Sequence, residues 1–214
     1  MKIPFHIAIE GTIGVGKTSL AKILGERLEA KLIIEEFEEN PFLVEFYKDA
    51  ERYAFQTQLF FLLSRYRQQQ KIKQTDLFSK ALLTDYMFIK DRLFAALNLN
   101  DKEMSLYNSV AHILEKNVSS PDMVIFLQSD TDRLMQNIKI RGREYEKMIN
   151  WKYLDALNQM YNELFFRYDS SPLLIINTND IDFVKNKNDL EAIIQFIRTP
   201  GEGTRYFNPL KSLS

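Results

Sequence analysis

Five short apolar runs alternate along the chain with longer segments of helical period. Each run is apolar at odd and even positions alike, which is typical of a strand buried on both faces of a sheet. The runs are Phe5–Glu10, Lys31–Glu35, Ala81–Asp85, Met123–Gln128 and Leu173–Asn177. The helical segments are Lys17–Ala30, Ala54–Gln70, Lys102–Asn117, Asp130–Ile140, Asn150–Tyr168 and Asn188–Ile197. This alternation predicts an α/β fold with a five-stranded parallel sheet flanked by helices.

The length of the chain favours a single domain over residues 1–214. With 214 residues and 45% hydrophobic content it can bury one substantial core, and it contains no internal repeat or low-complexity segment. The tail from about residue 199 to 214 reads TPGEGTRYFNPLKSLS and includes Gly201 and Gly203. We interpret this tail as an extended, mobile segment.

The segment EGTIGVGKTSL, from Glu10 to Leu20, matches the phosphate-binding pattern G-x-x-x-x-G-K-[ST]. It lies between an apolar strand and an amphipathic helix, which is the setting that gives the pattern its meaning. Backbone amides would face a polyphosphate, Lys17 would reach its outer phosphates, and the Thr18 hydroxyl would ligate Mg²⁺. The predicted nucleotide-binding residues are Gly11, Thr12, Ile13, Gly14, Val15, Gly16, Lys17, Thr18 and Ser19. We therefore expect ATP and Mg²⁺ as cofactors.

Composition narrows the possible partners. The formal net charge of −1 gives no general attraction to nucleic acid or to an anionic membrane, so neither is an expected partner. No apolar run approaches the roughly 20 residues of a membrane-spanning helix. The chain has no cysteine, and its first residues, MKIPFHIAIEG, leave no room for a signal peptide before the first strand. We expect a cytoplasmic protein.

A GTP-dependent switch is a possible use of such a loop. NKND at Asn186–Asp189 matches a guanine-reading N-K-x-D, but the preceding strand ends about ten residues earlier, which is the wrong position. A switch also needs a D-x-x-G turn, and no glycine of this sequence has Asp three places before it. We interpret this segment as the solvated start of a helix, with Asn188 or Asp189 as its cap.

A small-molecule kinase needs a carboxylate near the acceptor hydroxyl and mobile cations over the transferring phosphoryl group. Glu35 and Asp85 follow predicted strands, at the edge where open α/β sheets bind ligands. Glu35 would be the base, and Asp85 would serve Mg²⁺. Lys139, Arg141 and Arg143 surround a single glycine and predict a short Arg-rich lid over residues 137–147.

Four motifs resemble one known family. From Ile7 to about Ile197 the chain is similar to the deoxynucleoside kinases of the deoxycytidine, deoxyguanosine and deoxyadenosine kinase type, in their bacterial form. The motifs are YKDAERYAFQTQLFFLLSRYR from residue 47, DRLFA from residue 91, RGREYE from residue 141 and ENPF from residue 39. The resemblance also implies a homodimer packed through helices.

The resemblance assigns roles to individual residues. Glu35 falls on the general base of the family, Tyr47 and Glu146 would approach the sugar 3′-hydroxyl, and Arg141 and Arg143 would contact phosphates. The residues implied to bind the nucleobase are Gln58, Arg65, Asp91 and Phe94, with Arg65 paired to Asp91. Independently of the family, Gln58 and Arg65 lie two turns apart on one face of an otherwise apolar helix, so both need a polar partner.

Three positions depart from the family pattern. Tyr86 follows Asp85 where an arginine beside the 5′-oxygen is common, and a tyrosine supplies no cation at neutral pH. Lys139 and Arg92 are candidates for the missing charge. Asn137 stands where the lid usually has its first arginine, and Glu36 replaces the proline that usually follows the base. These changes bear on the rate of the reaction more than on its class.

The sequence thus predicts ATP- and Mg²⁺-dependent phosphorylation of the 5′-hydroxyl of a deoxyribonucleoside in nucleotide salvage. Deoxyadenosine or deoxyguanosine is the favoured substrate, with deoxycytidine as an alternative. Two other interpretations stay open: a thymidylate-type kinase that acts on a nucleoside monophosphate, and a non-catalytic nucleotide-binding regulator. The first would need cations for the phosphate of the acceptor, and the second gives no reason for Glu35, Tyr47 and Glu146.

Overall fold

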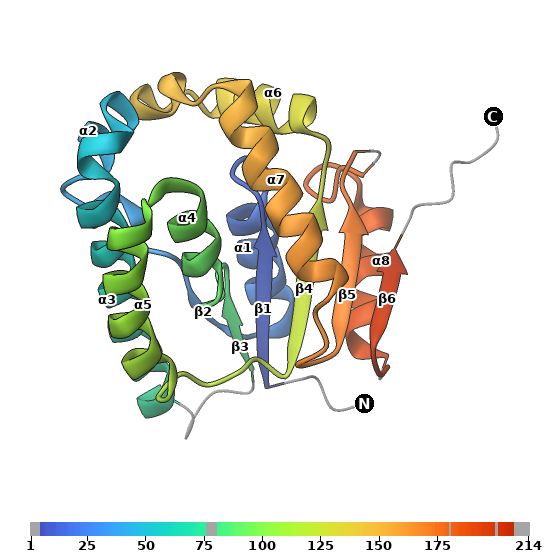
Figure 1. The fold of residues 1–214 in the computed structure, drawn as a ribbon. Coiled ribbons are helices and arrows are strands. Elements are labelled where there is room, and N and C mark those ends of the chain that lie inside the picture. Colours follow the sequence, from blue (N-terminus) through green and yellow to red (C-terminus); the bar gives the residue numbers. More distant parts are fainter. Residues whose placement is uncertain (1–4, 76–80, 180, 200, 208–214) are drawn as a thin grey trace.

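A computed structural model of the chain describes residues 5–75, 81–179, 181–199 and 201–207. One parallel sheet forms its centre, with six strands in the order β2-β3-β1-β4-β5-β6 (Figure 1). In chain order the strands are β1 His6–Gly11, β2 Lys31–Ile33, β3 Leu82–Thr84, β4 Met123–Gln128, β5 Leu173–Asn177 and β6 Thr204–Phe207. The predicted α/β fold is confirmed, and the sheet has one strand more than expected.

The additional strand, β6, comes from the tail. It runs parallel to β5 at the edge of the sheet, with Leu173 opposite Thr204 and Ile175 opposite Tyr206. Of its four residues only Phe207 is buried, and glycine precedes the segment, so its apolar pattern is too weak to indicate a strand. The interpretation of the tail as mobile is therefore wrong for Thr204–Phe207. Residues 200 and 208–214 of the same tail lie outside the described residues.

The helices are α1 Lys17–Leu28, α2 Leu43–Lys48, α3 Ala50–Thr75, α4 Lys90–Asn98, α5 Asp101–Glu115, α6 Thr131–Arg141, α7 Trp151–Phe166 and α8 Lys187–Arg198. Two 3₁₀ turns, η1 Phe37–Glu39 and η2 Glu144–Met148, complete the described elements. The sequence did not indicate α2 or α4, because helices of six and nine residues contain too few apolar repeats. The last helix is capped by Asn186, whose side chain accepts from the Asn188 amide, and not by the two residues that the sequence suggested.

Two faces of the sheet are covered by different helices (Figure 1). Ile7 and Ile9 of β1 pack in one core with Leu24 of α1 and Ile193 of α8. Ala8, between them on the strand, belongs to the opposite core, which α7 completes with Leu157, Tyr161 and Phe165. The alternation of side chains along a strand explains why each central strand must be apolar at every position.

A third cluster of buried side chains joins α3, α4 and α5 beside the sheet. Leu62, Ala95 and Tyr107 lie at its centre, and all three are fully buried. This packing fixes α3 and α4 against each other, which matters because both helices carry predicted site residues. Within the described part of the chain, no helix is both long and apolar enough to cross a membrane.

Candidate active site

The phosphate-binding loop connects β1 to α1 and depends on its glycines. Gly14 has a φ of 89°, in the region that favours glycine, and a Cβ added there would lie 2.8 Å from the Leu134 carbonyl oxygen. Gly16, with a φ of 103°, precedes α1, and no side chain caps that helix. The first amides of α1 are therefore available to an anion, as the loop pattern predicted.

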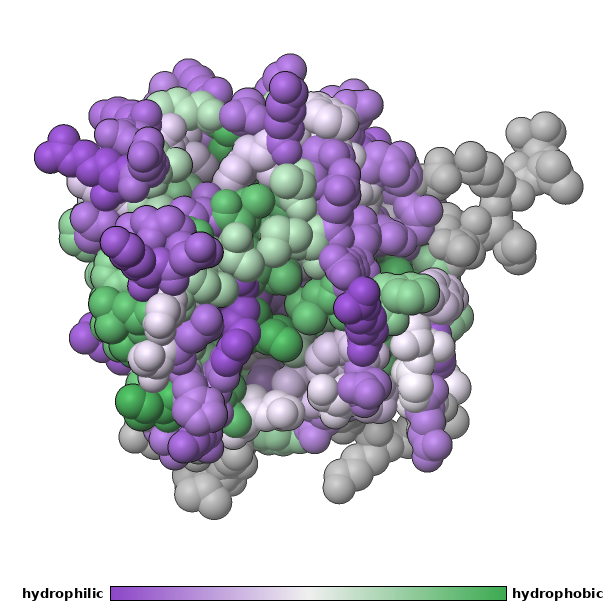
Figure 2. Space-filling model, viewed as in Figure 1, coloured by the Kyte–Doolittle hydropathy of each residue, from purple (hydrophilic) through white to green (hydrophobic). Residues whose placement is uncertain are grey.

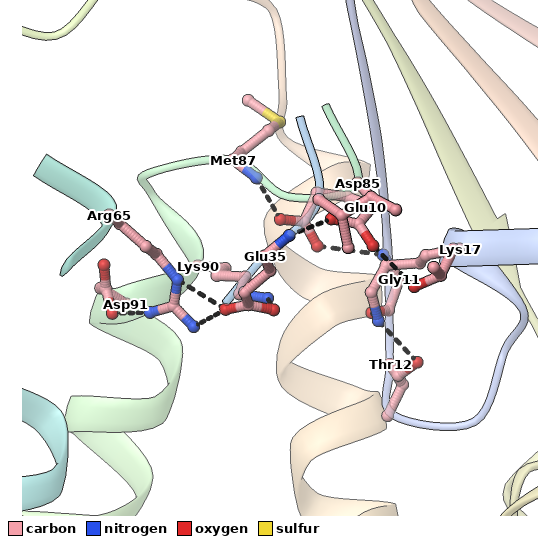
Figure 3. Close-up of polar contacts among 12 residues, drawn as sticks. Glu10, Gly11, Thr12, Lys17, Glu35, Arg65, Asp85, Met87, Lys90 and Asp91 are labelled. Atoms are coloured by element: carbon pink, nitrogen blue, oxygen red, sulfur yellow. Dashed lines mark hydrogen bonds and ion pairs between the residues drawn. The ribbon is translucent and has the colours of Figure 1, made fainter. Parts of the chain in front are cut away.

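Lys17 lies over the loop that it follows. Its Nζ donates to the Gly11 carbonyl oxygen at 2.7 Å and to the Thr12 carbonyl oxygen at 3.2 Å (Figure 3). Burial, with the nearby charge of Lys90, lowers the pKa of Lys17 to about 8. The amine thus stays mostly protonated at neutral pH and can bind a phosphate.

Thr18 and Asp85 meet where a metal ion would be expected. The Thr18 hydroxyl donates to Asp85 Oδ2 at 2.6 Å, and Asp85 Oδ1 accepts from the Glu35 amide at 2.7 Å. Magnesium prefers oxygen ligands and commonly takes one or two from the protein and the rest from phosphates and water. No group of three or more His, Cys, Asp or Glu that could hold a metal occurs among the described residues. The pair therefore fits Mg²⁺ that arrives with a nucleotide.

Glu35 lies two residues beyond β2, between two cations (Figure 3). Its Oε1 accepts from Arg65 Nε at 2.8 Å, and its Oε2 accepts from Lys90 Nζ at 2.5 Å. Burial alone would raise the pKa of Glu35, but Arg65 and Lys90 outweigh burial and lower it to about 2. The carboxylate is therefore ionised at neutral pH, and each of its oxygens accepts a hydrogen bond from a cation.

Two buried charged residues at this site were missed from the sequence: Lys90 and Glu10. Glu10 is fully buried, and its carboxylate accepts from the Gly11 amide at 3.1 Å and from the Met87 amide. Burial raises its pKa, against the opposing effect of Lys90 and Lys17. A glutamate inside a strand buried on both faces, and a lysine in a mostly apolar segment, are signals that such groups need partners.

The predicted base-binding residues come together on α3 and α4. Arg65 forms an ion pair with Asp91, as the family pattern implied, and both side chains are at most 5% exposed. Gln58 is buried on the same helix as Arg65. Gln58 Oε1 and Asp91 Oδ2 are buried without a hydrogen-bond partner among the described residues. Phe94 packs edge-on against Tyr161, with ring centroids 6.4 Å apart.

The predicted lid covers the end of α6, Gly142 and η2. Arg141 binds Glu146 through two hydrogen bonds of 2.9 and 2.7 Å, and Arg143 lies 3.4 Å from the same carboxylate. Tyr47 of α2 stacks on Tyr145, with ring centroids 6.0 Å apart. The lid arginines, Glu146 and Tyr47 therefore gather at one place between α2 and η2, and the predicted 3′-hydroxyl contacts are neighbours.

The departures from the family pattern have structural consequences. Asn137 donates to the Gly14 carbonyl oxygen at 2.9 Å, so it ties α6 to the phosphate-binding loop. Tyr86 is fully buried, and its hydroxyl has no hydrogen-bond partner among the described residues. Arg92 pairs with Glu115 at the surface, at 2.6 Å, and Lys139 is exposed on α6. Neither candidate for the missing cation therefore contacts Glu35, whereas Lys90 does.

The loop, the Thr18–Asp85 pair and the arginine lid at one edge of a parallel sheet define a P-loop kinase. Residues 7–200 match the family described as deoxynucleoside kinase, and the chain belongs to this family. It is thus a phosphotransferase that acts on deoxynucleosides. This finding favours the kinase over both alternatives that the sequence left open.

Several relatives support the family assignment across almost the whole chain. Deoxyguanosine kinase of Bacillus subtilis (strain 168) is 34% identical over 202 residues, which cover 91% of this chain and 96% of the relative. Deoxyadenosine kinase of Dictyostelium discoideum is 34% identical over 210 residues, which cover 96% and 82%. The structure of deoxyadenosine kinase from M. mycoides with bound dATP superimposes with a TM-score of 0.79 at 26% identity, and the alignment covers 91% of this chain and 100% of that one.

Proposed function

We propose that this kinase transfers the γ-phosphoryl group of ATP to the 5′-hydroxyl of a purine deoxynucleoside. The observation that carries the proposal is the connection of Glu35 to the phosphate-binding loop. The Glu35 amide donates to Asp85, and Asp85 accepts from the Thr18 hydroxyl. A carboxylate that accepts a hydroxyl proton thereby stands next to the oxygens that would hold Mg²⁺ and the donor phosphates.

In the proposed reaction, Glu35 accepts the proton of the 5′-hydroxyl as the 5′-oxygen bonds to the γ-phosphorus. The bond from the γ-phosphorus to the bridging oxygen breaks, and its electron pair leaves with ADP. Lys17 and the loop amides bind the donor phosphates, and Thr18 and Asp85 would hold Mg²⁺, which neutralises phosphate charge when bound. Arg141 and Arg143 would leave Glu146 to cover the transferring group as the lid closes.

The preference for deoxyadenosine or deoxyguanosine is supported by the buried, unpartnered oxygens of Gln58 and Asp91. These acceptors, with the donors of Arg65, suit the edge of a purine, although deoxycytidine also offers such an edge. Relatives named deoxyguanosine kinase and deoxyadenosine kinase point the same way. Tyr47 and Glu146 would bind the 3′-hydroxyl, and Phe94 would line the base pocket. We further propose a homodimer, while cytoplasmic localisation stays a prediction from the sequence.

A coupled assay of ADP release tests the proposal. Purified protein with ATP and Mg²⁺ is assayed with deoxyadenosine, deoxyguanosine, deoxycytidine, thymidine and thymidylate. The purine deoxynucleosides should give the highest kcat/KM, and thymidylate should give none. A higher value for deoxycytidine or thymidine would contradict the purine preference. Product analysis that places the phosphate elsewhere than the 5′-oxygen would contradict the proposed chemistry.

A further inference from the structure

Lys90 is the first residue of α4, and it is placed where few lysines occur. Its side chain is 5% exposed, and its Nζ lies 2.5 Å from Glu35 Oε2. Lysine is almost never so buried without a specific partner. Here the partner is Glu35, the carboxylate that we propose as the proton acceptor, and this contact fixes the position of Lys90 relative to that carboxylate.

Lys90 also acts on the residues of the phosphate-binding loop. After burial, its charge is the main influence that lowers the pKa of Lys17. It acts on Glu10 as well, which lies directly before the loop. Glu10, Glu35 and Asp85 act on Lys17 in the opposite direction, so their carboxylates offset part of the repulsion between the two ammonium groups. Lys90 therefore belongs to the same cluster of charges as the lysine of the phosphate-binding loop.

The other positive charges near this edge are either remote from Glu35 or already bound through all of their nitrogen atoms. Tyr86, at the position where the family commonly has an arginine, is buried and cannot carry a positive charge. Arg92 is held by Glu115 at the surface, and Lys139 is exposed on α6. Arg65 does contact Glu35, but its Nε and Nη2 are held there and its Nη1 is held by Asp91, on the side away from the phosphate-binding loop (Figure 3). Lys90 thus has the position that a cation for the transferring group requires.

We propose that Lys90 supplies the positive charge beside the phosphoryl group while that group moves from ATP to the 5′-oxygen. This inference rests on the proposed function, because it takes Glu35 as the proton acceptor. Lys90 acts as a charge and a hydrogen-bond donor, and it transfers no proton in this step. When the γ-phosphoryl group approaches the 5′-oxygen, the Nζ donates to an equatorial phosphoryl oxygen, and Glu35 receives the hydroxyl proton. The charge thereby comes from a residue four positions after Tyr86, where the family commonly has an arginine.

Three variants of Lys90 separate its charge from its role in holding Glu35. Lys90→Met removes the charge and the hydrogen bond, Lys90→Gln keeps a donor for Glu35 without the charge, and Lys90→Arg keeps both. We expect Lys90→Met and Lys90→Gln to lower kcat by roughly 10² to 10³, the range for loss of one group that stabilises transition-state charge. Lys90→Arg should recover at least tenfold over Lys90→Gln. Arg92→Met, the matched loss of a neighbouring cation, should stay within about twofold of the wild type.

A binding measurement tests the inference without turnover. ADP with Mg²⁺ and aluminium fluoride mimics the transferring phosphoryl group, so its affinity relative to ADP with Mg²⁺ alone reports the charge around that group. The ratio should fall at least tenfold in Lys90→Gln and stay unchanged in Arg92→Met. Thermal unfolding curves should show that both variants are folded. If Lys90→Gln keeps the wild-type kcat and the wild-type ratio, the inference is overturned. If the wild type phosphorylates no deoxynucleoside but the ratio still depends on Lys90, the proposed function fails and the role of Lys90 stands.

Discussion

The guanidinium of Arg65 forms an ion pair with the carboxylate of Glu35, 30 residues earlier in the chain. The same guanidinium pairs with Asp91 on α4. One arginine therefore joins the proposed proton acceptor to the proposed base-reading carboxylate. If the nucleobase of a bound nucleoside changes the contacts of Arg65, it also changes the charge around the 5′-hydroxyl. Recognition of the nucleobase would in this way be coupled to phosphoryl transfer.

Replacing Glu35 by Gln should leave ATP affinity intact and should lower kcat by roughly 10² or more, the range for a positioned base. It should also lower the unfolding temperature, because buried Lys90 loses its carboxylate partner. The amide can still accept from Arg65 but cannot take the hydroxyl proton. Steady-state kinetics with the best deoxynucleoside, together with ATP titration, measure kcat and ATP affinity. Glu36→Gln is the matched control, because Glu36 is the exposed neighbour of Glu35. A Glu35→Gln enzyme with near wild-type kcat would remove Glu35 from the role of base.

The pKa of about 8 for Lys17 predicts how ATP use depends on pH. Only the protonated amine attracts phosphate, so kcat/KM for ATP should fall as the pH rises above about 8. Bound phosphates favour the charged amine, and kcat should therefore stay level to a higher pH than kcat/KM. In Lys17→Arg, whose side chain stays charged, the decline near pH 8 should disappear even if the activity is lower. A decline that persists in Lys17→Arg would mean that another group titrates.

The contact with the 3′-hydroxyl can be tested with 3′-deoxy analogues. Tyr47→Phe and Glu146→Gln should each weaken the use of substrates with a 3′-hydroxyl more than the use of 3′-deoxy analogues. The physical reason is that a buried polar group left unpaired costs about 1–3 kcal/mol. Because Glu146 also binds Arg141, the Tyr47 variant gives the cleaner result.

Tyr145→Phe serves as the control for Tyr47→Phe, since Tyr145 stacks on Tyr47 but is not a proposed ligand of the sugar. In Tyr145→Phe, any fall in kcat/KM should be equal for substrates with a 3′-hydroxyl and for 3′-deoxy analogues. Equal losses in the Tyr47 and Glu146 variants would show that neither side chain binds the 3′-hydroxyl.

Much of this site could be predicted because its residues follow strands or lie in a contiguous motif. The phosphate-binding loop is such a motif, and parallel strands place Glu35 and Asp85 at one edge of the sheet. Lys90 and Asn158 are different, since their roles depend on where helices pack. Asn158 of α7 accepts from the Thr12 hydroxyl at 2.7 Å, across 146 residues of sequence. Neither the spacing nor the composition of the chain indicates that contact.

Variants of the Arg65–Asp91 pair test how the kinase selects the nucleobase of its substrate. In the proposed nucleobase pocket, this pair would stand on the side where a thymine methyl group would have to sit, so thymidine should be a poor substrate. The double variant Arg65→Met, Asp91→Ala should make room for the methyl group and remove the polar match. Relative kcat/KM should then shift toward thymidine by about one to two powers of ten, because a buried pair that reads a base edge is worth a few kcal/mol.

Arg65→Met alone should be worse than the double variant. Arg65→Met leaves Asp91 as an unpaired charge, only 1% exposed, and also takes a partner from Glu35. Asp91→Ala leaves Arg65 paired with Glu35, so it should be the milder single change. Values of kcat/KM for thymidine and deoxyadenosine, measured for all four enzymes, give the ranking. If the wild type already uses thymidine as well as the purine deoxynucleosides, or if the double variant leaves their ratio unchanged, Arg65 and Asp91 do not read the base.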